Sequence, residues 1–268
     1  MKKESENICF GSLDEEIGWW KISASVRQNY RLKRRDDFKQ YLGDWKTLKG
    51  LEVGALDFPI FGKEESDIFF ADFYSYEQLI EKYKDSSIFN PAEIVRPEFV
   101  VPELDYYDQI QQSFDYIVAC HVMEHLPNPF GFLKSVMARL KGGGALFLTI
   151  PDKRFIQEDC RRETTPFPHL LTDFEENPKA LSFDHYVDFV WGIESEPRAD
   201  LQGLIEKAKG LFDSGTFDIH SHIWTDFSFK YQIEYLQKQW DPKFEILLCS
   251  STPYPAGYNE FTVILRKL

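Results

Sequence analysis

The segment from Asp218 to His222 reads Asp-Ile-His-Ser-His and carries two imidazoles close to a carboxylate. Side chains alternate in an extended segment, so Asp218, His220 and His222 are expected on one face. Such a set can act as a general base with an orienting partner. It could also form a metal site with His169 as a further ligand, or a hydrogen-bonded structural cluster at a domain junction. Of these three interpretations we predict the general base. Asp218, His220 and His222 are then catalytic residues, and no metal is expected.

A second segment, which begins at Pro151, reads Pro-Asp-Lys-Arg-Phe. Asp152 comes directly after an apolar run that predicts a strand, and so stands at the carboxyl end of that strand. Guanidinium groups bind phosphate or carboxylate bidentately, which Arg154 and Arg161 could do here. We predict Asp152 as a further catalytic residue, and Arg154, Arg161 and His169 as substrate-binding residues.

A glycine follows the first predicted strand, in the segment Leu-Glu-Val-Gly-Ala-Leu-Asp-Phe-Pro at 51–59. Gly54 lets the backbone approach a ligand closely, because no Cβ intervenes. The dinucleotide-binding pattern G-x-G-x-x-G is absent, which argues against NAD and FAD. Asp72 ends the second predicted strand, 18 positions further on. Its carboxylate can accept hydrogen bonds from both hydroxyls of a ribose, or it can serve as an acid at the start of the following helix.

Polar side chains also follow the third and fourth predicted strands. An acidic residue after the third, Glu103 or Asp105, could meet an adenine amino group, and the residues alone leave that choice open. The fourth strand ends in Cys120 and His121, which precede Val-Met-Glu-His-Leu. His125 either caps the next helix or packs beneath the ligand.

Short apolar runs alternate with helix-like stretches through most of the chain. This alternation predicts βαβ units and a mostly parallel sheet that is covered on both faces. A hairpin-like loop at 251–259 makes the last strand antiparallel. The predicted strands include 51–53, 68–71, 99–101, 116–119, 145–150, 245–249 and 260–265, and the predicted helices include 76–83, 130–140 and 225–240.

The same patterns divide the chain into three parts. Residues 1–45 predict a helical N-terminal extension, whose basic cluster (Arg31, Lys33, Arg34 and Arg35) is interpreted as a solvated helix face. Residues 46–151 and 223–268 form the ligand-binding α/β domain. Residues 152–222 break the rhythm of strands, and predict an inserted helical or irregular cap that binds substrate.

Together these motifs resemble class I S-adenosylmethionine-dependent methyltransferases. The resemblance is carried by E-V-G-A-L at 52–56, Asp72, F-D-Y-I-V-A at 114–119, H-V-M-E-H-L at 121–126 and L-K-G-G-G-A-L-F-L-T-I-P at 140–151. It implies a Rossmann-like, doubly wound, seven-stranded sheet with an antiparallel last strand, and S-adenosylmethionine as cofactor.

The resemblance also implies roles for individual residues. Gly54 and its neighbours approach the methionine part of the cofactor, and Asp72 holds the ribose. Cys120 and His121 border the sulfonium. Leu56 stands where the family usually has a second glycine. The full set of predicted cofactor-binding residues is Glu52, Gly54, Ala55, Asp57, Asp72, Asp105, Cys120 and His121.

The P-D-K-R-F and H-x-H motifs resemble a bacterial subgroup that often accompanies capsule, O-antigen or other glycan assembly. This likeness implies O-methylation of a sugar, or of a related small hydroxyl-bearing or anionic acceptor, in surface polysaccharide or secondary-metabolite biosynthesis. The Asn/Asp-Pro-Pro-Tyr/Phe motif of many nucleobase N-methylating enzymes is missing after the fourth strand. The alternatives are a catalytically inactive S-adenosylmethionine-binding partner or regulatory protein, and a nicotinamide-dependent oxidoreductase.

The composition of the 268-residue chain limits its partners and compartment. Lys and Arg number 31 against 44 Asp and Glu, which gives a formal charge of −13 and argues against nucleic acid or an anionic membrane surface as partner. No apolar run approaches the roughly 20 residues of a membrane helix, and none follows Met1 as a signal peptide. The four widely spaced cysteines predict reduced thiols in a cytoplasmic protein. The expected partner is a small-molecule or glycan acceptor, and the oligomeric state is not indicated.

Overall fold

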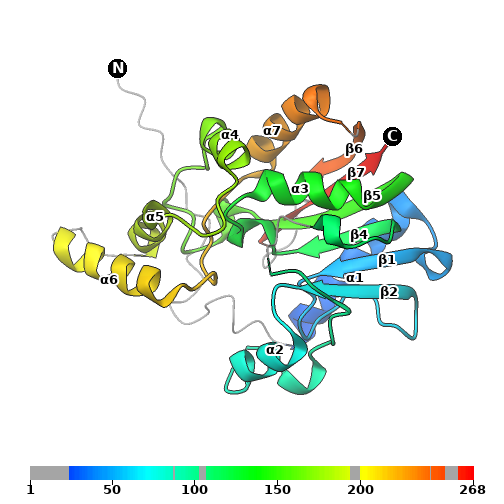
Figure 1. The fold of residues 1–268 in the computed structure, drawn as a ribbon, viewed down its shortest axis with the longest axis horizontal. Coiled ribbons are helices and arrows are strands. Elements are labelled where there is room, and N and C mark those ends of the chain that lie inside the picture. Colours follow the sequence, from blue (N-terminus) through cyan, green and yellow to red (C-terminus); the bar gives the residue numbers. More distant parts are fainter. Residues whose placement is uncertain (1–23, 87, 103–106, 194–199, 242, 251–258) are drawn as a thin grey trace.

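A computed structural model describes residues 24–86, 88–102, 107–193, 200–241, 243–250 and 259–268. Seven strands form one sheet in the order β3-β2-β1-β4-β5-β7-β6 (Figure 1). Neighbours from β3 to β5 are parallel, whereas β7 is antiparallel to both β5 and β6. This topology confirms the predicted fold. The strands are β1 (Lys49–Val53), β2 (Asp67–Asp72), β3 (Phe99–Val100), β4 (Phe114–Cys120), β5 (Leu140–Pro151), β6 (Phe244–Ser250) and β7 (Glu260–Lys267).

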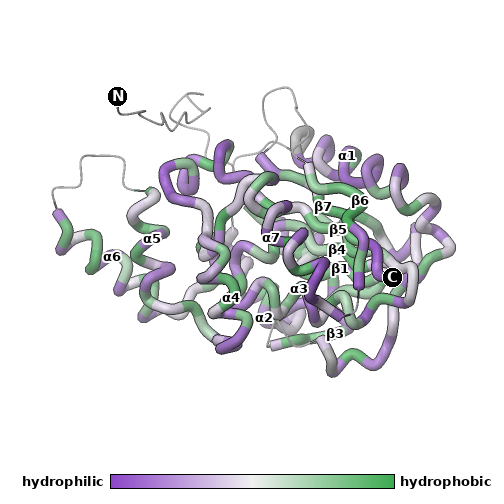
Figure 2. Tube along the Cα trace, turned by 90° about the horizontal axis from the view of Figure 1, so that it is seen from above, coloured by the Kyte–Doolittle hydropathy of each residue, from purple (hydrophilic) through white to green (hydrophobic). Residues whose placement is uncertain are grey.

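Helices cover both faces of the sheet, as Figure 2 shows for α1 on one side and α3 on the other. Ile117 and Ala119 of β4 belong to the apolar cluster that includes α3 and α7, while Tyr116 and Val118 belong to the cluster with Phe38 of α1. The period-two alternation along β4 therefore serves two buried faces, as a parallel strand requires. The helices are α1 (Ala24–Leu42), α2 (Tyr76–Tyr83), α3 (Pro129–Ala138), α4 (Phe167–Glu176), α5 (Phe183–Ile193), α6 (Leu201–Ser214) and α7 (Asp226–Gln239).

The chain between β5 and α7 forms α4, α5 and α6 and no strand of the sheet among its described residues. Helices α5 and α6 have an apolar cluster of their own, which includes Tyr186, Val190 and Leu204. They extend from the end of the sheet at which β1, β4 and β5 finish (Figure 1). Among the described residues, no helix has both the length and the apolar character needed to cross a membrane.

Two expectations need correction. The basic cluster on α1 is not a solvated face, because Arg34 is buried against Glu260 and Arg35 pairs with Glu65. The cysteines are not all reduced thiols: Cys120 and Cys249 are free, but Cys160 is disulfide-bonded. Cys9 lies outside the described residues.

Candidate cofactor and acceptor site

The residues singled out in the sequence gather where the parallel strands end. Gly54 follows β1, Asp72 ends β2, His121 follows β4 and Asp152 follows β5. Because these strands are parallel and adjacent, their carboxyl ends meet at one edge of the sheet. Open α/β sheets bind ligands at this edge, where strand order reverses. Here the order reverses between β1 and β4.

The turn after β1 has the backbone conformation that close approach to a ligand needs. Gly54 has a φ of +68°, and a Cβ added there would lie 3.0 Å from Cγ2 of Val122. Leu56, which replaces the usual second glycine, has a φ of +48°. The left-handed conformation costs a non-glycine residue about 1–2 kcal/mol. Leu56 therefore adopts the left-handed conformation that a glycine would usually supply at this position. The Val95 N–H donates a hydrogen bond to the Leu56 carbonyl at 2.9 Å.

Two of the predicted cofactor-binding acids, Glu52 and Asp57, make contacts that shape this loop. Glu52 is buried, and both its carboxylate oxygens accept the Ile60 N–H at 3.0 Å. Burial raises the pKa of Glu52 to about 7. Asp57 pairs with Arg27 of α1 at 2.7 Å and accepts the Asn90 N–H at 2.8 Å. Ala55, in the same loop, packs against the apolar cluster beneath α1.

Asp72, the predicted ribose-binding residue, is buried at the end of β2. Its side chain accepts the Tyr74 N–H at 3.1 Å, and only 8% of the residue is exposed. Burial raises the pKa of Asp72 to about 6, because this backbone donor does not compensate fully for lost water. Asp105 and the alternative Glu103 lie outside the described residues.

The turn after β4 holds His121 in a strained conformation. Its φ is +54°, and its N–H donates to the Thr149 carbonyl at 3.0 Å. Nε2 lies 2.6 Å from Oε2 of Glu260, which also pairs with Arg34 of α1. Burial opposes ionisation of Glu260, but Arg34 and His121 outweigh it and hold its pKa below the usual range. Beside His121, burial raises the pKa of the Cys120 thiol to about 12, so this thiol stays neutral.

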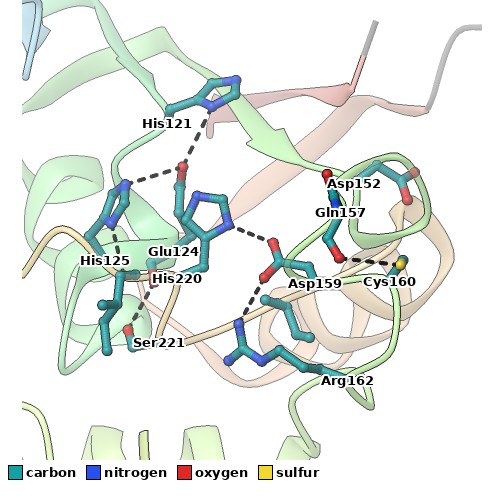
Figure 3. A network of polar contacts seen from close by, with 12 residues as sticks. His121, Glu124, His125, Asp152, Gln157, Asp159, Cys160, Arg162, His220 and Ser221 are labelled. Carbon is teal, nitrogen blue, oxygen red and sulfur yellow. Dashed lines mark hydrogen bonds and ion pairs between the residues drawn. The ribbon is translucent and has the colours of Figure 1, made fainter. Parts of the chain in front are cut away.

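Glu124 lies beneath this turn among three imidazoles (Figure 3). Its carboxylate is buried and accepts no hydrogen bond from the described residues. One of its oxygens lies 3.7 Å from Nδ1 of His121 and 3.7 Å from Nε2 of His125. Glu124, His125 and His220 bring one potential ligand atom each within 4.8 Å of the others. Burial lowers the pKa of His125, although the charge of Glu124 opposes this shift.

His220 is paired with a carboxylate, but not with the one expected. Its Nδ1 lies 2.5 Å from Oδ2 of Asp159, and Oδ1 of Asp159 accepts from Arg162 at 2.8 Å (Figure 3). Burial lowers the pKa of His220, but the charge of Asp159 outweighs it and the net shift is upward. Asp218 is exposed and pairs with Lys82 at 3.0 Å. The predicted shared face is wrong because the chain bends at Ile219.

The second imidazole of the H-x-H motif lies in a different cluster. His222 is fully buried, with Nε2 3.1 Å from Oδ2 of Asp173. His169 approaches the same carboxylate at 3.2 Å and Nε2 of His185 at 3.1 Å. The structure thus separates His220 from His222 and brings His169 and His222 together.

Asp152 and Arg154, two of the three charged residues that follow β5, pair with each other. Asp152 is fully buried, and Arg154 donates to both its oxygens. Arg154 also contacts Asp226 at 2.7 Å, so two carboxylates share its charge. Arg161 is exposed.

Sequence reasoning missed four residues of this site. Glu124 stands inside the H-V-M-E-H-L motif and Asp159 lies four residues after the P-D-K-R-F motif, so an acidic residue in or near each motif was the available signal. Arg34 and Glu260 carry no local signal, since their pairing joins residues 226 positions apart.

The fold defines a Rossmann-like α/β protein, and its candidate ligand site lies at the carboxyl ends of the parallel strands. The profile of the family described as "methyltransferase domain" matches residues 25–191, more than half of the chain. The chain therefore belongs to the methyltransferase domain family. S-Adenosylmethionine is its cofactor, which confirms that prediction.

Solved structures similar to the chain include three methyltransferases. A plantazolicin methyltransferase in complex with a substrate analogue and S-adenosylhomocysteine is 11% identical, covers 92% of this chain and 87% of its own, and has a TM-score of 0.48. Magnesium protoporphyrin IX methyltransferase from Synechocystis PCC 6803 is 10% identical, with 91% and 85% covered and a TM-score of 0.45. An S-adenosylmethionine-dependent methyltransferase from Clostridium acetobutylicum is 9% identical, with 92% and 93% covered and a TM-score of 0.46. No curated protein matches the chain.

Proposed function

We propose that this methyltransferase transfers the methyl group of S-adenosylmethionine to a hydroxyl of a sugar, or of a related small hydroxyl-bearing or anionic acceptor, with His220 as the general base. The observation that carries the proposal is the buried pair of His220 and Asp159 beside the turn that follows β4. The acceptor class also rests on the P-D-K-R-F and H-x-H motifs, and we place the reaction in surface polysaccharide or secondary-metabolite biosynthesis.

The geometry of His220 suits a base. Asp159 accepts a hydrogen bond from the Nδ1–H group of His220, so the neutral ring carries its lone pair on Nε2. Arg162 holds Asp159 and contacts Asp188 at 2.7 Å, which fixes the orientation of the pair. When Nε2 takes a proton from the acceptor hydroxyl, the imidazolium is stabilised by Asp159 and by Glu124. His222 is not required as a base in this arrangement.

The cofactor, when bound, supplies a methyl group on a sulfonium for in-line displacement. Gly54 would allow the backbone close to its methionine part, and Asp72 would accept hydrogen bonds from its ribose. Reaction requires alignment of the acceptor oxygen with the methyl carbon and exclusion of water. His121 borders this place, and its attachment to Glu260 holds it there.

We assign acceptor binding to the inserted residues 152–222. Arg154 and Arg161 are the candidates for an anionic group of the acceptor, and Arg154 also pairs with Asp152 and Asp226. Asp152 then acts as a positioning residue that holds the turn at 153–155, where its side chain accepts the Arg154 N–H at 3.1 Å.

The test is calorimetric titration of the chain with S-adenosylmethionine, followed by a screen of sugar and small hydroxyl acceptors that measures S-adenosylhomocysteine release. We expect His220→Asn to lower kcat by ~10²–10⁴-fold, because a positioned base contributes that much. The Kd for the cofactor should stay unchanged. Asp72→Ala should show the opposite pattern, with affinity lowered by ~10–100-fold through loss of charged hydrogen bonds.

Three results would contradict the proposal. The first is a chain that binds no S-adenosylmethionine. The second is a chain that binds it and turns over no acceptor in the screen, which supports the inactive binding partner. The third is a His220→Asn variant at the wild-type rate.

A further inference from the structure

Four side chains from three separate parts of the chain meet in a cluster that is separate from the His220–Asp159 pair. His169 and Asp173 lie one turn apart on α4, His185 lies on α5, and His222 lies in the segment before α7. Each offers one ligand atom, and these atoms all lie within 4.8 Å of one another. We propose that this cluster is a structural binding site for a divalent transition-metal ion, best fitted by Zn²⁺, although the sequence alone led us to expect no metal.

The spacing of the ligand atoms fits a tetrahedral ion. Zn²⁺ binds imidazole nitrogen and carboxylate oxygen at about 2.0–2.2 Å, so the edge of a tetrahedron of such ligands is about 3.3–3.5 Å. Nε2 of His169 lies 3.1 Å from Nε2 of His185 and 3.2 Å from Oδ2 of Asp173. Nε2 of His222 lies 3.1 Å from the same oxygen. Small outward shifts would complete the coordination.

The outer nitrogens of two imidazoles are already fixed by hydroxyl groups. Nδ1 of His185 lies 2.9 Å from Oγ of Ser182, and Nδ1 of His222 lies 3.1 Å from Oγ of Ser221. Metal-binding histidines show this arrangement, in which a hydrogen bond on one nitrogen turns the other toward the ion.

The hydrogen bonds of Ser221 settle the tautomer of neutral His222. Ser221 donates its hydroxyl proton to the Glu124 carbonyl at 2.8 Å, so its oxygen accepts from Nδ1 of His222. Nε2 then presents a lone pair to the carboxylate of Asp173 at 3.1 Å. Two acceptors at that distance repel each other. A cation between them removes the repulsion and binds both.

Burial indicates that the ion would be structural. His185 and His222 and the carboxylate of Asp173 are largely buried, while the His169 side chain is 40% exposed and leaves a way in. Four protein ligands fill a tetrahedral ion and leave no open position for substrate, which is typical of structural zinc. The ion would fasten α4 and α5 to the segment that carries His220. This proposal does not depend on the reaction assigned above.

The test uses the full chain, stripped with a chelator, dialysed and titrated with Zn²⁺. We expect one ion per chain by elemental analysis and a rise in Tm on Zn²⁺ addition. Co²⁺ should give the intense visible absorption of a tetrahedral site. His169→Asn and Asp173→Asn should weaken Zn²⁺ binding by at least ~10-fold, since even outer-shell changes cost that much. Glu175→Gln, an exposed change on the same helix, is the matched control and should bind as the wild type does.

Ser182→Ala keeps all four ligands and guards against a ligand variant that fails to fold. It should bind Zn²⁺ ~10–100-fold more weakly with the same stoichiometry. The proposal is overturned if the stripped chain takes up no Zn²⁺ at micromolar concentration. It is also overturned if His169→Asn and Glu175→Gln bind Zn²⁺ equally well. Neither result would alter the assignment of His220, because cofactor binding and turnover are measured separately.

Discussion

At the scale of single residues, the identity of the carboxylate beside His220 decides how the proposed base behaves. Asp159 contacts Nδ1 of His220, whereas Asp218 lies on the surface with Lys82. Both are aspartates and both can be replaced by asparagine without a change of shape. The two substitutions therefore compare the observed partner with the one that the spacing predicts.

We expect Asp159→Asn to lower kcat by about 10²-fold or more and Asp218→Asn to leave it nearly unchanged, since loss of the partner removes the correct tautomer. The pH–rate profile gives a second measurement. Because the pKa of His220 is raised, the neutral base is lost as pH falls, and the rate should decline below an apparent pKa that lies above 6.5. In Asp159→Asn this limb should move to lower pH. Equal rates for the two variants would rule out the assignment.

The candidate cofactor-site residues whose position in the fold could be predicted are those next to strand ends. Gly54 and Asp72 were placed correctly at the edge because each directly adjoins an apolar run. The partners of the imidazoles could not be predicted, since the contact of His220 with Asp159 spans 61 positions and depends on how the inserted residues fold back. The alternation of side chains in an extended segment did not predict the positions of Asp218 and His220, because the chain bends at Ile219 between them.

At the scale of elements, α1 joins the first loop of the sheet to its last strand. Arg27 pairs with Asp57 of the loop after β1, Arg34 pairs with Glu260 at the start of β7, and the Tyr30 hydroxyl donates to Asn259 at 2.8 Å. The sequence predicts the helix, but the cationic side chains gave no sign of which acids they would meet. The composition of α1 suggests a solvated helix, but ion pairs such as Arg34–Glu260 attach it to the sheet.

We predict that Arg34→Met lowers the free energy of unfolding by about 3–5 kcal/mol, because it leaves a buried carboxylate without its main partner. Arg35→Met on the same helix breaks the more exposed pair with Glu65 and should cost less than about 1 kcal/mol. Urea denaturation of both variants measures the difference. Adding Glu260→Gln to Arg34→Met should restore part of the loss, and equal costs for the two single variants would contradict the buried role of Arg34.

At the scale of the whole molecule, the succession of elements was predictable and the contacts between distant elements were not. Strand runs from 51 to 150 appear in the sheet because each is apolar enough to be buried on both faces. The sheet order follows from that succession and from the family resemblance. The positions of α5 and α6 depend on an apolar cluster that these two helices form with each other. The pattern of predicted strands does not predict this cluster.

Stability should also depend on pH through buried carboxyl groups. Glu52 has a pKa raised from 4.5 to about 7 by burial. A raised pKa in the folded state gives stability that is fully present below 4.5 and is lost as pH rises through 7. The wild type should therefore lose stability relative to Glu52→Gln between pH 5 and pH 8, measured by urea denaturation at each pH. A constant difference between the two proteins would show that Glu52 titrates normally.

The Arg34–Glu260 ion pair between α1 and β7 can form only late in the synthesis of the chain. Translation delivers Arg34 long before Glu260, and β7 is inserted between β5 and β6, two strands synthesised earlier. A nascent polypeptide that ends before residue 260 has neither the anchor of His121 nor the acid that holds α1. Cofactor binding should begin only when the final strand leaves the ribosome, so chains stalled before that point should not retain S-adenosylmethionine.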